Sequence, residues 1–257
     1  MDKKIIHYCW FGPNEIPEKE KKCIASWSKL LPDYEIKFWN ESNFDVNENR
    51  FCKEAYEAKK YAFVSDYVRT KIIYLYGGIY LDSDVEVFNG FEAILNQHKN
   101  FLGFETKTKL GTAVLAFEKE HPLIKDFLNF YQQNPFINEK GEVNTIANVT
   151  ILTDLMIKKG LKIDGSNQKI DDIEVFNREY FYPKKINDEL FKFTNKTVAV
   201  HKCSNSWMTD REKKRGKNIF WINVMRPLLR NLRALGLKLI SEKNIQKIEV
   251  GIRNKLK

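Results

Sequence analysis

Two aspartates separated by one residue, Asp82 and Asp84, are the side chains whose type and spacing point most directly to chemistry. They lie in the stretch Ile79 to Phe88, whose alternation of apolar and polar residues predicts a strand. A period of two would place Tyr80, Asp82, Asp84 and Glu86 on one face of that strand. Two adjacent carboxylates form a hard oxygen site that suits Mg²⁺ or Mn²⁺, with a diphosphate completing the coordination shell. Acidic residues at a strand end are also often merely solvated, so the flanking residues must decide.

The segment before this strand carries a second charged pair. A helical period and many aromatic residues predict one long helix over Glu54 to Tyr76, closed by the glycine pair at 77–78. Asp66 and Arg69 are three residues apart and share a face of this helix. An arginine there can bind a phosphate or a sugar hydroxyl. The alternative is a plain surface ion pair of little energetic value.

The elements that must position these residues predict an α/β fold. The N-terminal strand spans 3–11, a helix spans Pro17 to Leu31, and a second strand spans Tyr34 to Trp39. Such a βαβ unit builds a parallel sheet, and many of these sheets bind nucleotides at the carboxyl ends of their strands. Further strands are expected at 101–105, 113–117 and 198–201, and further helices at 122–131 and 148–159. We expect a mostly parallel central sheet.

Five short motifs occur in a fixed order along the chain. They are HYCWFG at 7–12, WNESNF at 39–44, SDYVR at 65–69, GGIYLDSD at 77–84 and SW at 206–207. Together they resemble the glycosyltransferases with a DXD sugar-binding motif, of the family 32 type found in capsule and mannan synthesis. The core is also similar to that of the clostridial glucosylating toxins. The resemblance implies a GT-A fold, a nucleotide-diphospho-sugar donor, a divalent metal and retention of anomeric configuration.

The resemblance also implies a role for each matching residue. Trp10 would stack on or near the nucleotide base, Asn43 would approach the donor, and Tyr80 would line the donor pocket. Asp66 and Arg69 would hold sugar hydroxyls and phosphate. The remaining roles concern the diphosphate and its metal: Asp82 would touch ribose or sugar and also neighbour the metal, Asp84 would bind the metal, and Ser206 and Trp207 would close over the diphosphate.

His201 is a further candidate metal ligand, because GT-A enzymes of other families place a C-terminal histidine on the metal. Each assignment has a structural alternative. Trp10 and Tyr80 could be core aromatics, and a lone histidine such as His201 usually has a structural role. No residue matches a catalytic nucleophile. The region Gly111 to Phe117, where acceptor contacts would be expected, shows no pattern.

Charge is distributed unevenly along the 257 residues. Positions 208–257 hold fourteen Lys or Arg and four Asp or Glu, a net charge of +10, whereas residues 1–207 are close to neutral at −1. We therefore expect a GT-A-like catalytic domain over 1–207 and a basic amphipathic helical tail over 208–257, with its main helix from Trp221 to Ile240. Such a helix suits an anionic membrane interface. The alternative is that its apolar side packs on the domain. Nucleic-acid binding is not expected, because no recognition motif accompanies the basic residues.

Composition also indicates a location. The four cysteines form no CxxC pair, and the chain has no secretory signal at its start and no run of eighteen apolar residues. These features predict a cytoplasmic protein, with peripheral contact of the tail to the inner face of the plasma membrane.

The function expected from the sequence is a retaining, metal-dependent transfer of a hexose. The donor would be UDP-galactose or UDP-glucose, and the acceptor a glycan or lipid-linked sugar in surface polysaccharide synthesis. Two alternatives stay open. A glycoside hydrolase would need its two carboxylates on either side of a glycosidic bond, and it would act without nucleotide. A non-catalytic sugar-nucleotide-binding module would bind the donor without turnover.

Overall fold

A computed structural model describes residues 4–139, 141–144, 146–184 and 191–203. The chain divides into two compact units, 1–204 and 205–257. The expected domain boundary after residue 207 and the expected tail helix therefore lie outside the described residues. Within the described ranges, every helix is too short or too polar to cross a bilayer.

The N-terminal βαβ unit forms as the sequence predicts. Strand β1 (Ile5–Cys9) is followed by helix α1 (Glu18–Leu30) and strand β2 (Glu35–Trp39). The two strands pair in parallel over their full length, with Ile5 opposite Glu35. Trp27 of α1 is completely buried, and its indole Nε1–H donates to the carbonyl of Val85 at 2.7 Å. This contact ties α1 to the segment that follows the two aspartates.

The single helix expected over 54–76 is wrong, because two helices occupy this part of the chain. Helix α2 (Arg50–Glu57) and helix α3 (Tyr61–Tyr76) are separated by a short connection. Lys59 adopts a left-handed φ of 57° there, and the Lys60 N–H donates to the Ala55 carbonyl at 2.8 Å, closing α2. Asn49 caps the start of α2 through its side chain. The break lets α2 fold back onto α3, so that its aromatic side chains join the core.

The central sheet has seven strands in the order β2-β1-β3-β6-β5-β8-β7. Strands β6 and β7 run opposite to the other five, so the prediction of a mostly parallel sheet is confirmed. The strands beyond β1 and β2 are β3 (Gly78–Leu81), β5 (Asn100–Gly103), β6 (Val114–Phe117), β7 (Gln168–Ile170) and β8 (Ile173–Phe176). The short helix α4 (Glu92–Leu95) and strands β7 and β8 were not expected from the sequence.

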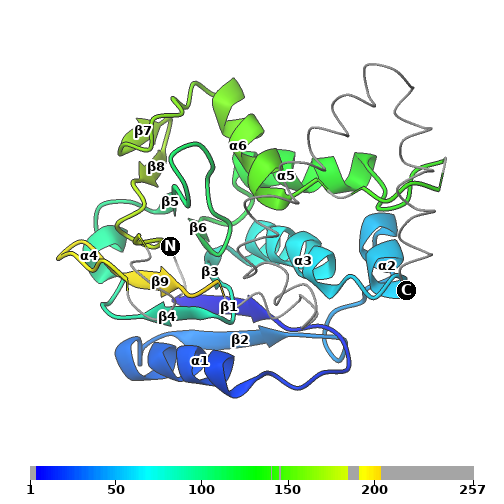
Figure 1. Cartoon of the computed structure of the whole chain (residues 1–257), viewed down its shortest axis with the longest axis horizontal. Helices are drawn as coiled ribbons and strands as arrows, with labels where there is room; N and C mark the ends of the chain where they lie inside the picture. Colours follow the sequence, from blue (N-terminus) through cyan, green and yellow to red (C-terminus); the bar gives the residue numbers. More distant parts are fainter. Residues whose placement is uncertain (1–3, 140, 145, 185–190, 204–257) are drawn as a thin grey trace, which may run out of the picture. The chain divides into compact units, whose positions relative to one another are not determined.

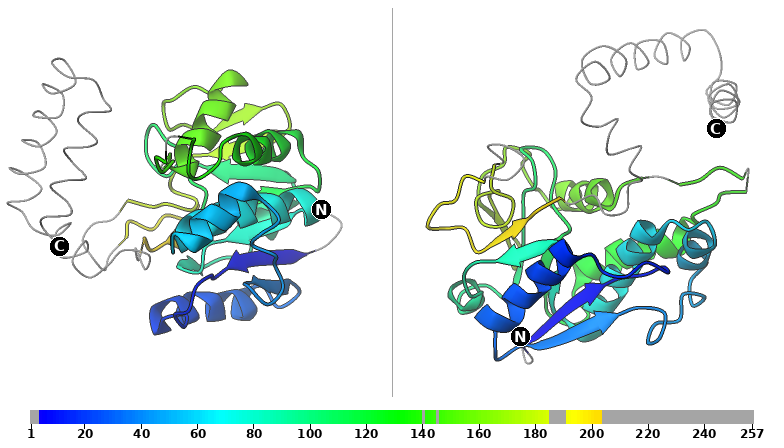
Figure 2. Two further views of the ribbon diagram at one scale, coloured as in Figure 1. Left: turned by 90° about the vertical axis from the view of Figure 1, so that its right-hand side faces the viewer. Right: turned by 60° about the horizontal axis from the view of Figure 1, so that its bottom comes forward.

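The continuous strand expected over 79–88 is also wrong. The chain leaves the central sheet after Leu81 and turns, with the Val85 N–H donating to the Asp82 carbonyl at 2.9 Å. Strand β4 (Val85–Val87) then pairs with β9 (Ala199–His201) in a separate antiparallel ribbon, which Figures 1 and 2 show as neighbouring cyan and yellow arrows. Aspartate and serine favour turns, which is the physical reason for the break.

The alternation of side chains along the strands builds two apolar cores, one on each face of the sheet. Tyr80, Leu115 and Phe117 belong to the core beneath α2, α3, α5 (Pro122–Gln133) and α6 (Asn148–Lys158). Ile79 and Leu81 belong instead to the core shared with α1, α4, β4 and β9. The helices therefore cover both faces of the sheet (Figure 1). Because both faces are buried, β1 and β3 are apolar almost throughout.

A buried histidine in β1 makes the stability of this fold dependent on pH. The His7 ring Nε2–H donates to the Gly77 carbonyl at 2.9 Å, and its Nδ1 accepts from the Trp39 Nε1–H at 3.1 Å. This arrangement fits only the neutral ring, because a proton on Nδ1 would face another donor. Burial lowers the pKa of His7 to about 4.

We expect the free energy of unfolding to fall on acidification because the unfolded chain binds this proton first. An unfolded histidine titrates near pH 6.5, so from there down to about pH 4 only the unfolded state gains the proton. Between about pH 7.5 and about pH 5, His7 should therefore account for a loss of about 2 kcal/mol in urea unfolding. The non-titrating His7→Gln variant should show a flatter pH dependence, whereas His98→Gln, at a partly exposed position, should keep the wild-type slope. An unchanged slope in His7→Gln would contradict this assignment.

Candidate active site

The carboxyl ends of β1, β2 and β3 lie at the same edge of the central sheet, because these three strands are adjacent and parallel. Trp10 follows β1, the loop containing Asn43 follows β2, and Asp82 follows β3. Three of the predicted donor-site residues therefore come from neighbouring strand ends. This edge is where parallel α/β sheets commonly bind nucleotides.

The turn from Asp82 to Asp84 brings the two carboxylates together in a way that the single-strand interpretation did not foresee. Asp82 extends the ladder of β3, with its N–H donating to the Ala113 carbonyl at 2.9 Å. Asp84 sits in the turn at the start of β4, and the paired strand β9 places His201 opposite Val85. The His201 Nε2 is 3.3 Å from an Asp84 carboxylate oxygen. The pairing of β4 with β9 thus joins residues separated by more than a hundred positions.

Asp82 is held by Arg69, so the charged pair on the preceding helix faces the end of β3. The Arg69 Nη1 lies 3.1 Å from one Asp82 oxygen and 3.2 Å from the other. The Arg69 Nη2 lies 3.0 Å from Asp66. Asp66 and Arg69 are therefore no plain surface ion pair, since the Arg69 side chain is only 7% exposed. One guanidinium bridges two carboxylates.

Tyr80 lies directly against this bridge. Its ring is buried, with the Arg69 guanidinium 4.8 Å from the ring centroid. Its hydroxyl donates to Asp82 at 2.9 Å. The structure thus gives Tyr80 two contacts that orient the network, a stacking contact and a hydrogen bond. Both oxygens of Asp82 face Arg69, so the arginine and Tyr80 fix the orientation of this carboxylate.

The Asp66 carboxyl is the most perturbed acid in this network. Burial raises the pKa of Asp66 to about 7, although the neighbouring Arg69 opposes the shift. The Asn148 side chain, at the start of α6, donates to the same carboxyl. A buried carboxyl with a strongly shifted pKa beside a cluster of charges is a common feature of functional sites.

Three side chains could hold a divalent cation at the turn. One ligand atom each from Asp82, Asp84 and His201 lies within 4.8 Å of the others. Carboxylate oxygens match Mg²⁺ or Mn²⁺, and the imidazole nitrogen also suits later transition metals. Although burial opposes the charged ring, hydrogen bonds to Asp84 and Cys203 raise the pKa of His201 well above its usual value. The residues present therefore fit a metal, with Asp82, Asp84 and His201 as its ligands.

An open hollow of about 380 Å³ lies at the ends of β1 and β2 and is lined by Trp10, Gly12, Phe38 and Glu41 among others. The Trp10 Nε1–H donates to the Asn14 carbonyl at 2.7 Å, which fixes the indole. Asn43 is exposed beside this hollow. Its side chain donates to the Phe38 carbonyl at 2.7 Å and accepts from the Asn40 N–H at 3.0 Å. In the structure, Asn43 therefore shapes the loop on which the hollow rests.

Sequence reasoning missed the neighbours that come from the second half of the chain. The Thr112 carbonyl accepts from Arg69 at 3.0 Å, Asn148 bonds Asp66, and Glu105 lies 3.9 Å from the His201 ring. None of them belongs to a motif. The only sign of these contacts in the sequence was Asn148, a polar residue at the start of the expected helix at 148–159. Ser206 and Trp207, predicted to close over the diphosphate, lie outside the described residues.

Known proteins resemble this chain in sequence and in fold. The family described as the glycosyltransferase sugar-binding region containing DXD motif matches residues 17–102. The inositol phosphoceramide mannosyltransferase 3 of Schizosaccharomyces pombe is 33% identical over 129 residues, which cover 47% of this chain and 35% of that protein. An uncharacterized glycosyltransferase of Acanthamoeba polyphaga mimivirus is 25% identical over 219 residues, covering 80% and 84% of the two chains.

Among solved structures, the PaToxG glycosyltransferase superposes with a TM-score of 0.51 at 20% identity, over 62% of this chain and 70% of that one. At this identity the likeness bears on the fold, which is confirmed as the GT-A type. A Legionella pneumophila protein named subversion of eukaryotic traffic protein A is 30% identical over 112 residues. The chain spans about a third of the length of the yeast mannosyltransferase and 17% of the length of the Legionella protein. Residues 17–102 are thus similar to the DXD-containing sugar-binding region of glycosyltransferases, the yeast and mimivirus relatives are glycosyltransferases by name, and the solved structure shares the fold.

Proposed function

We propose that this protein is a retaining, metal-dependent glycosyltransferase that moves a hexose from a UDP-sugar to a glycan or lipid-linked acceptor. The observation that carries the proposal is the convergence of Asp82, Asp84 and His201 at the carboxyl edge of the sheet. The carboxylates there neighbour a buried arginine on one side and the Trp10 hollow lies at the same edge. That arrangement suits a ligand with an aromatic base, a diphosphate and a sugar.

Each part of the donor has candidate partners at this edge. The fixed indole of Trp10 offers a stacking surface for the base. Arg69 keeps Asp82 oriented, so that Asp82 can accept from a ribose or sugar hydroxyl. Asp66, held by Arg69 and Asn148, is placed to contact the sugar. These roles are hypotheses that the contacts support and that binding measurements can test.

Asp82, Asp84 and His201 would hold the divalent cation, Mn²⁺ or Mg²⁺. When bound, the cation would neutralise charge that develops on the leaving diphosphate. The proposal of retention follows the family resemblance, with the acceptor hydroxyl attacking from the side of the departing diphosphate.

The choice of a hexose and of a lipid-linked acceptor draws on the relatives. The name of the Schizosaccharomyces pombe protein describes a mannosyl group and a ceramide-based lipid. Capsule-type synthesis is the setting that the family resemblance favours. A glycoside hydrolase is less well supported, because Asp82 and Asp84 flank one turn and their closest ligand atoms lie within 4.8 Å, whereas hydrolases hold their carboxyls about 5 Å or more apart across the bond.

The proposal is tested by a donor screen. Purified protein is incubated with each UDP-hexose and with GDP-mannose, with Mn²⁺ and with or without acceptor, and released nucleotide is measured. We expect release from one donor class, loss of the signal in EDTA and recovery with Mn²⁺ or Mg²⁺. Full activity in EDTA would contradict the metal requirement. Cleavage of an intact glycan without nucleotide would favour the hydrolase, and donor binding without turnover would favour the binding module.

We further propose that the basic tail, 208–257, brings the enzyme to an anionic membrane surface where a lipid-linked acceptor resides. The support is its net charge of +10 against a nearly neutral body. Each basic residue near an anionic leaflet contributes about 1 kcal/mol. The full chain should cosediment with vesicles containing phosphatidylglycerol at low salt, and release at high salt. A failure of the intact chain to bind at low salt would end this proposal.

A further inference from the structure

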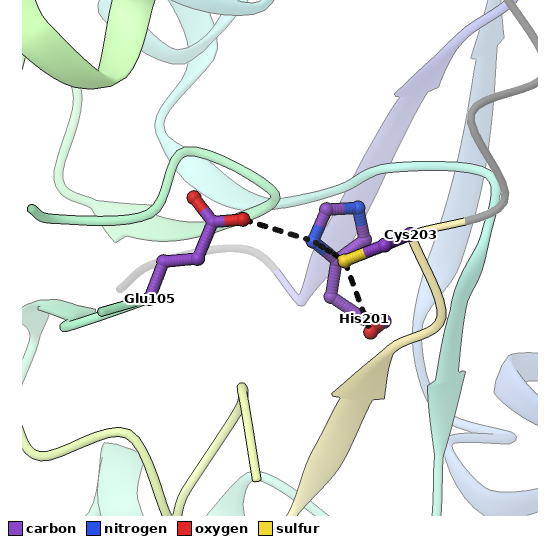
Figure 3. Close-up of side chains that lie close together, drawn as sticks. All are labelled: Glu105, His201 and Cys203. Carbon is purple, nitrogen blue, oxygen red and sulfur yellow. Dashed lines mark hydrogen bonds and ion pairs between the residues drawn. The ribbon is translucent and has the colours of Figure 1, made fainter. Parts of the chain in front are cut away.

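The His201 ring has a second set of neighbours on the side opposite Asp84. Its Nδ1 lies 3.5 Å from the Cys203 sulfur and 3.9 Å from a Glu105 carboxylate oxygen. Figure 3 shows the three side chains converging from two separate segments. Glu105 belongs to the turn after β5, where its N–H donates to the Lys109 carbonyl at 3.0 Å. Cys203 follows β9, with a left-handed φ of 53°.

The chemistry of these three groups differs from that of the aspartate turn. One ligand atom each from Glu105, His201 and Cys203 lies within 4.8 Å of the others. A thiolate, an imidazole and a carboxylate are the ligand types that bind Zn²⁺ in proteins. Hard cations such as Mg²⁺ and Mn²⁺ prefer oxygen, so they gain little from a sulfur ligand. Thiophilic cations would therefore choose this group over the aspartate turn.

The two nitrogens of His201 connect the two groups. A metal on Nδ1 requires that the ring proton reside on Nε2, where Asp84 can accept it across the 3.3 Å contact. A carboxylate that orients a metal-bound histidine in this way is a recurring feature of zinc sites. A metal held by Asp84 and Nε2 requires the opposite placement of the ring proton. The neutral ring cannot present a lone pair on both nitrogens, so the two sites exclude each other.

We propose that Glu105, His201 and Cys203 form a binding site for a thiophilic divalent cation of the Zn²⁺ class, and that its occupancy withdraws His201 and Asp84 from the donor-site cation. Binding converts the Cys203 thiol to a thiolate and displaces the proton on the His201 Nδ1, so two protons are released to solvent. The site leaves at least one position for water. The withdrawal of the donor-site ligands rests on the proposed function, whereas the binding itself does not.

Cysteine accessibility makes the binding directly observable. Cys203 is exposed, whereas Cys9, Cys23 and Cys52, the other cysteines of the chain, are buried. A metal–thiolate absorption band from the folded protein therefore reports on Cys203. Co²⁺ and Cd²⁺ give such charge-transfer bands in the ultraviolet and replace Zn²⁺ in sites with thiolate ligands.

The first experiment titrates the full chain, stripped of metal, with Co²⁺ or Cd²⁺ and follows the thiolate band. We expect saturation at one cation per chain, reversal by Zn²⁺ competition and release of about two protons. Cys203→Ser should abolish the band, and Glu105→Gln should weaken binding by about tenfold or more. Glu118→Gln, an exposed change of the same kind, and Cys23→Ala should bind as wild type. No band in the wild type, or an undiminished band in Cys203→Ser, overturns the site.

The second experiment tests the coupling of the two sites. Micromolar Zn²⁺ is added to Mn²⁺-supported nucleotide release, and the activity of each variant is compared with its own value without Zn²⁺. The half-inhibitory Zn²⁺ concentration should rise by about tenfold or more in Cys203→Ser and in Glu105→Gln. Zinc binding without inhibition overturns the coupling. If no donor is turned over at all, the proposed function fails while the absorption titration still decides the metal site.

Discussion

Replacing Asp84 with asparagine should lower nucleotide release by about a hundredfold to a thousandfold, with little change in thermal stability. The substitution keeps the shape of the side chain but removes the negative charge with which Asp84 would hold a divalent cation. Stabilisation of developing charge is commonly the largest single contribution to catalysis, and losing one such interaction costs about a hundredfold to a thousandfold. The backbone of the turn is held by bonds that the substitution leaves intact, such as the one from the Lys202 N–H to the Asp84 carbonyl at 3.0 Å.

Glu86→Gln is the matched control for this prediction. Glu86 lies two residues after Asp84, in β4, and interacts with Lys202 at 2.6 Å instead of with His201. The substitution removes the same negative charge as Asp84→Asn. Its variant should retain activity within a few-fold of wild type. Mn²⁺ binding, measured by electron paramagnetic resonance in the presence of the donor, should weaken in Asp84→Asn alone. Activity of Asp84→Asn close to wild type would remove Asp84 from the metal site.

The local part of this site could be predicted from sequence because its residues lie on short segments with strong signals. Short segments rich in apolar residues give the strands β1, β2 and β3, and the glycine pair at 77–78 marks the end of α3. Gly77 and Gly78 both have positive φ, and a Cβ at Gly78 would lie 2.8 Å from the Ile5 carbonyl oxygen. The order of strand ends then places Trp10, Asn43 and Asp82 at one edge.

What sequence could not provide were the changes of direction and the long-range pairings. The period of two continues through Asp82 and Asp84 into β4, so nothing in the alternation reveals that the chain changes sheets there. Asp-Ser-Asp favours a turn, but this segment was interpreted as a metal-binding motif on a strand and not as a turn. His201 reaches Asp84 only through the pairing of β4 with β9. Strands β7 and β8 were not predicted because they are short and partly polar.

Replacing Arg69 with methionine should destabilise the protein by about 3–5 kcal/mol and also abolish activity. Arg69 is buried and bridges Asp66 and Asp82, so its removal leaves two carboxylates without their cation. Breaking a buried ion pair from one side costs this much because the remaining charge is uncompensated. Methionine fills a similar volume, which limits the cavity contribution. The measurement is urea unfolding at neutral pH, together with donor turnover.

Arg50→Met is the control for the loss of an arginine. Arg50 also pairs with a carboxylate, Glu54, at 2.7 Å, but its side chain is 64% exposed. That variant should lose less than about 1 kcal/mol, because exposed ion pairs contribute little. Equal destabilisation by the two substitutions would mean that burial does not set the cost at Arg69.

A double-mutant cycle with Asp66 separates stability from function in this network. Burial raises the pKa of Asp66 to about 7, so above that pH the folded protein holds an unfavourable charge that Asp66→Asn removes. The sign follows from linkage: a carboxyl with a raised folded pKa contributes less stability as pH rises through that pKa. Asp66→Asn alone should therefore leave stability nearly unchanged at about pH 8, and it should partly rescue Arg69→Met, with a coupling of about 1–3 kcal/mol.

The same Asp66→Asn variant should nevertheless lose donor turnover. The charged Asp66 side chain lowers the stability of the protein, and we attribute its presence to a contact with the donor. If Asp66→Asn instead unfolds the protein and spares the turnover of the fraction that folds, Asp66 is structural and the sugar contact falls to Asp82.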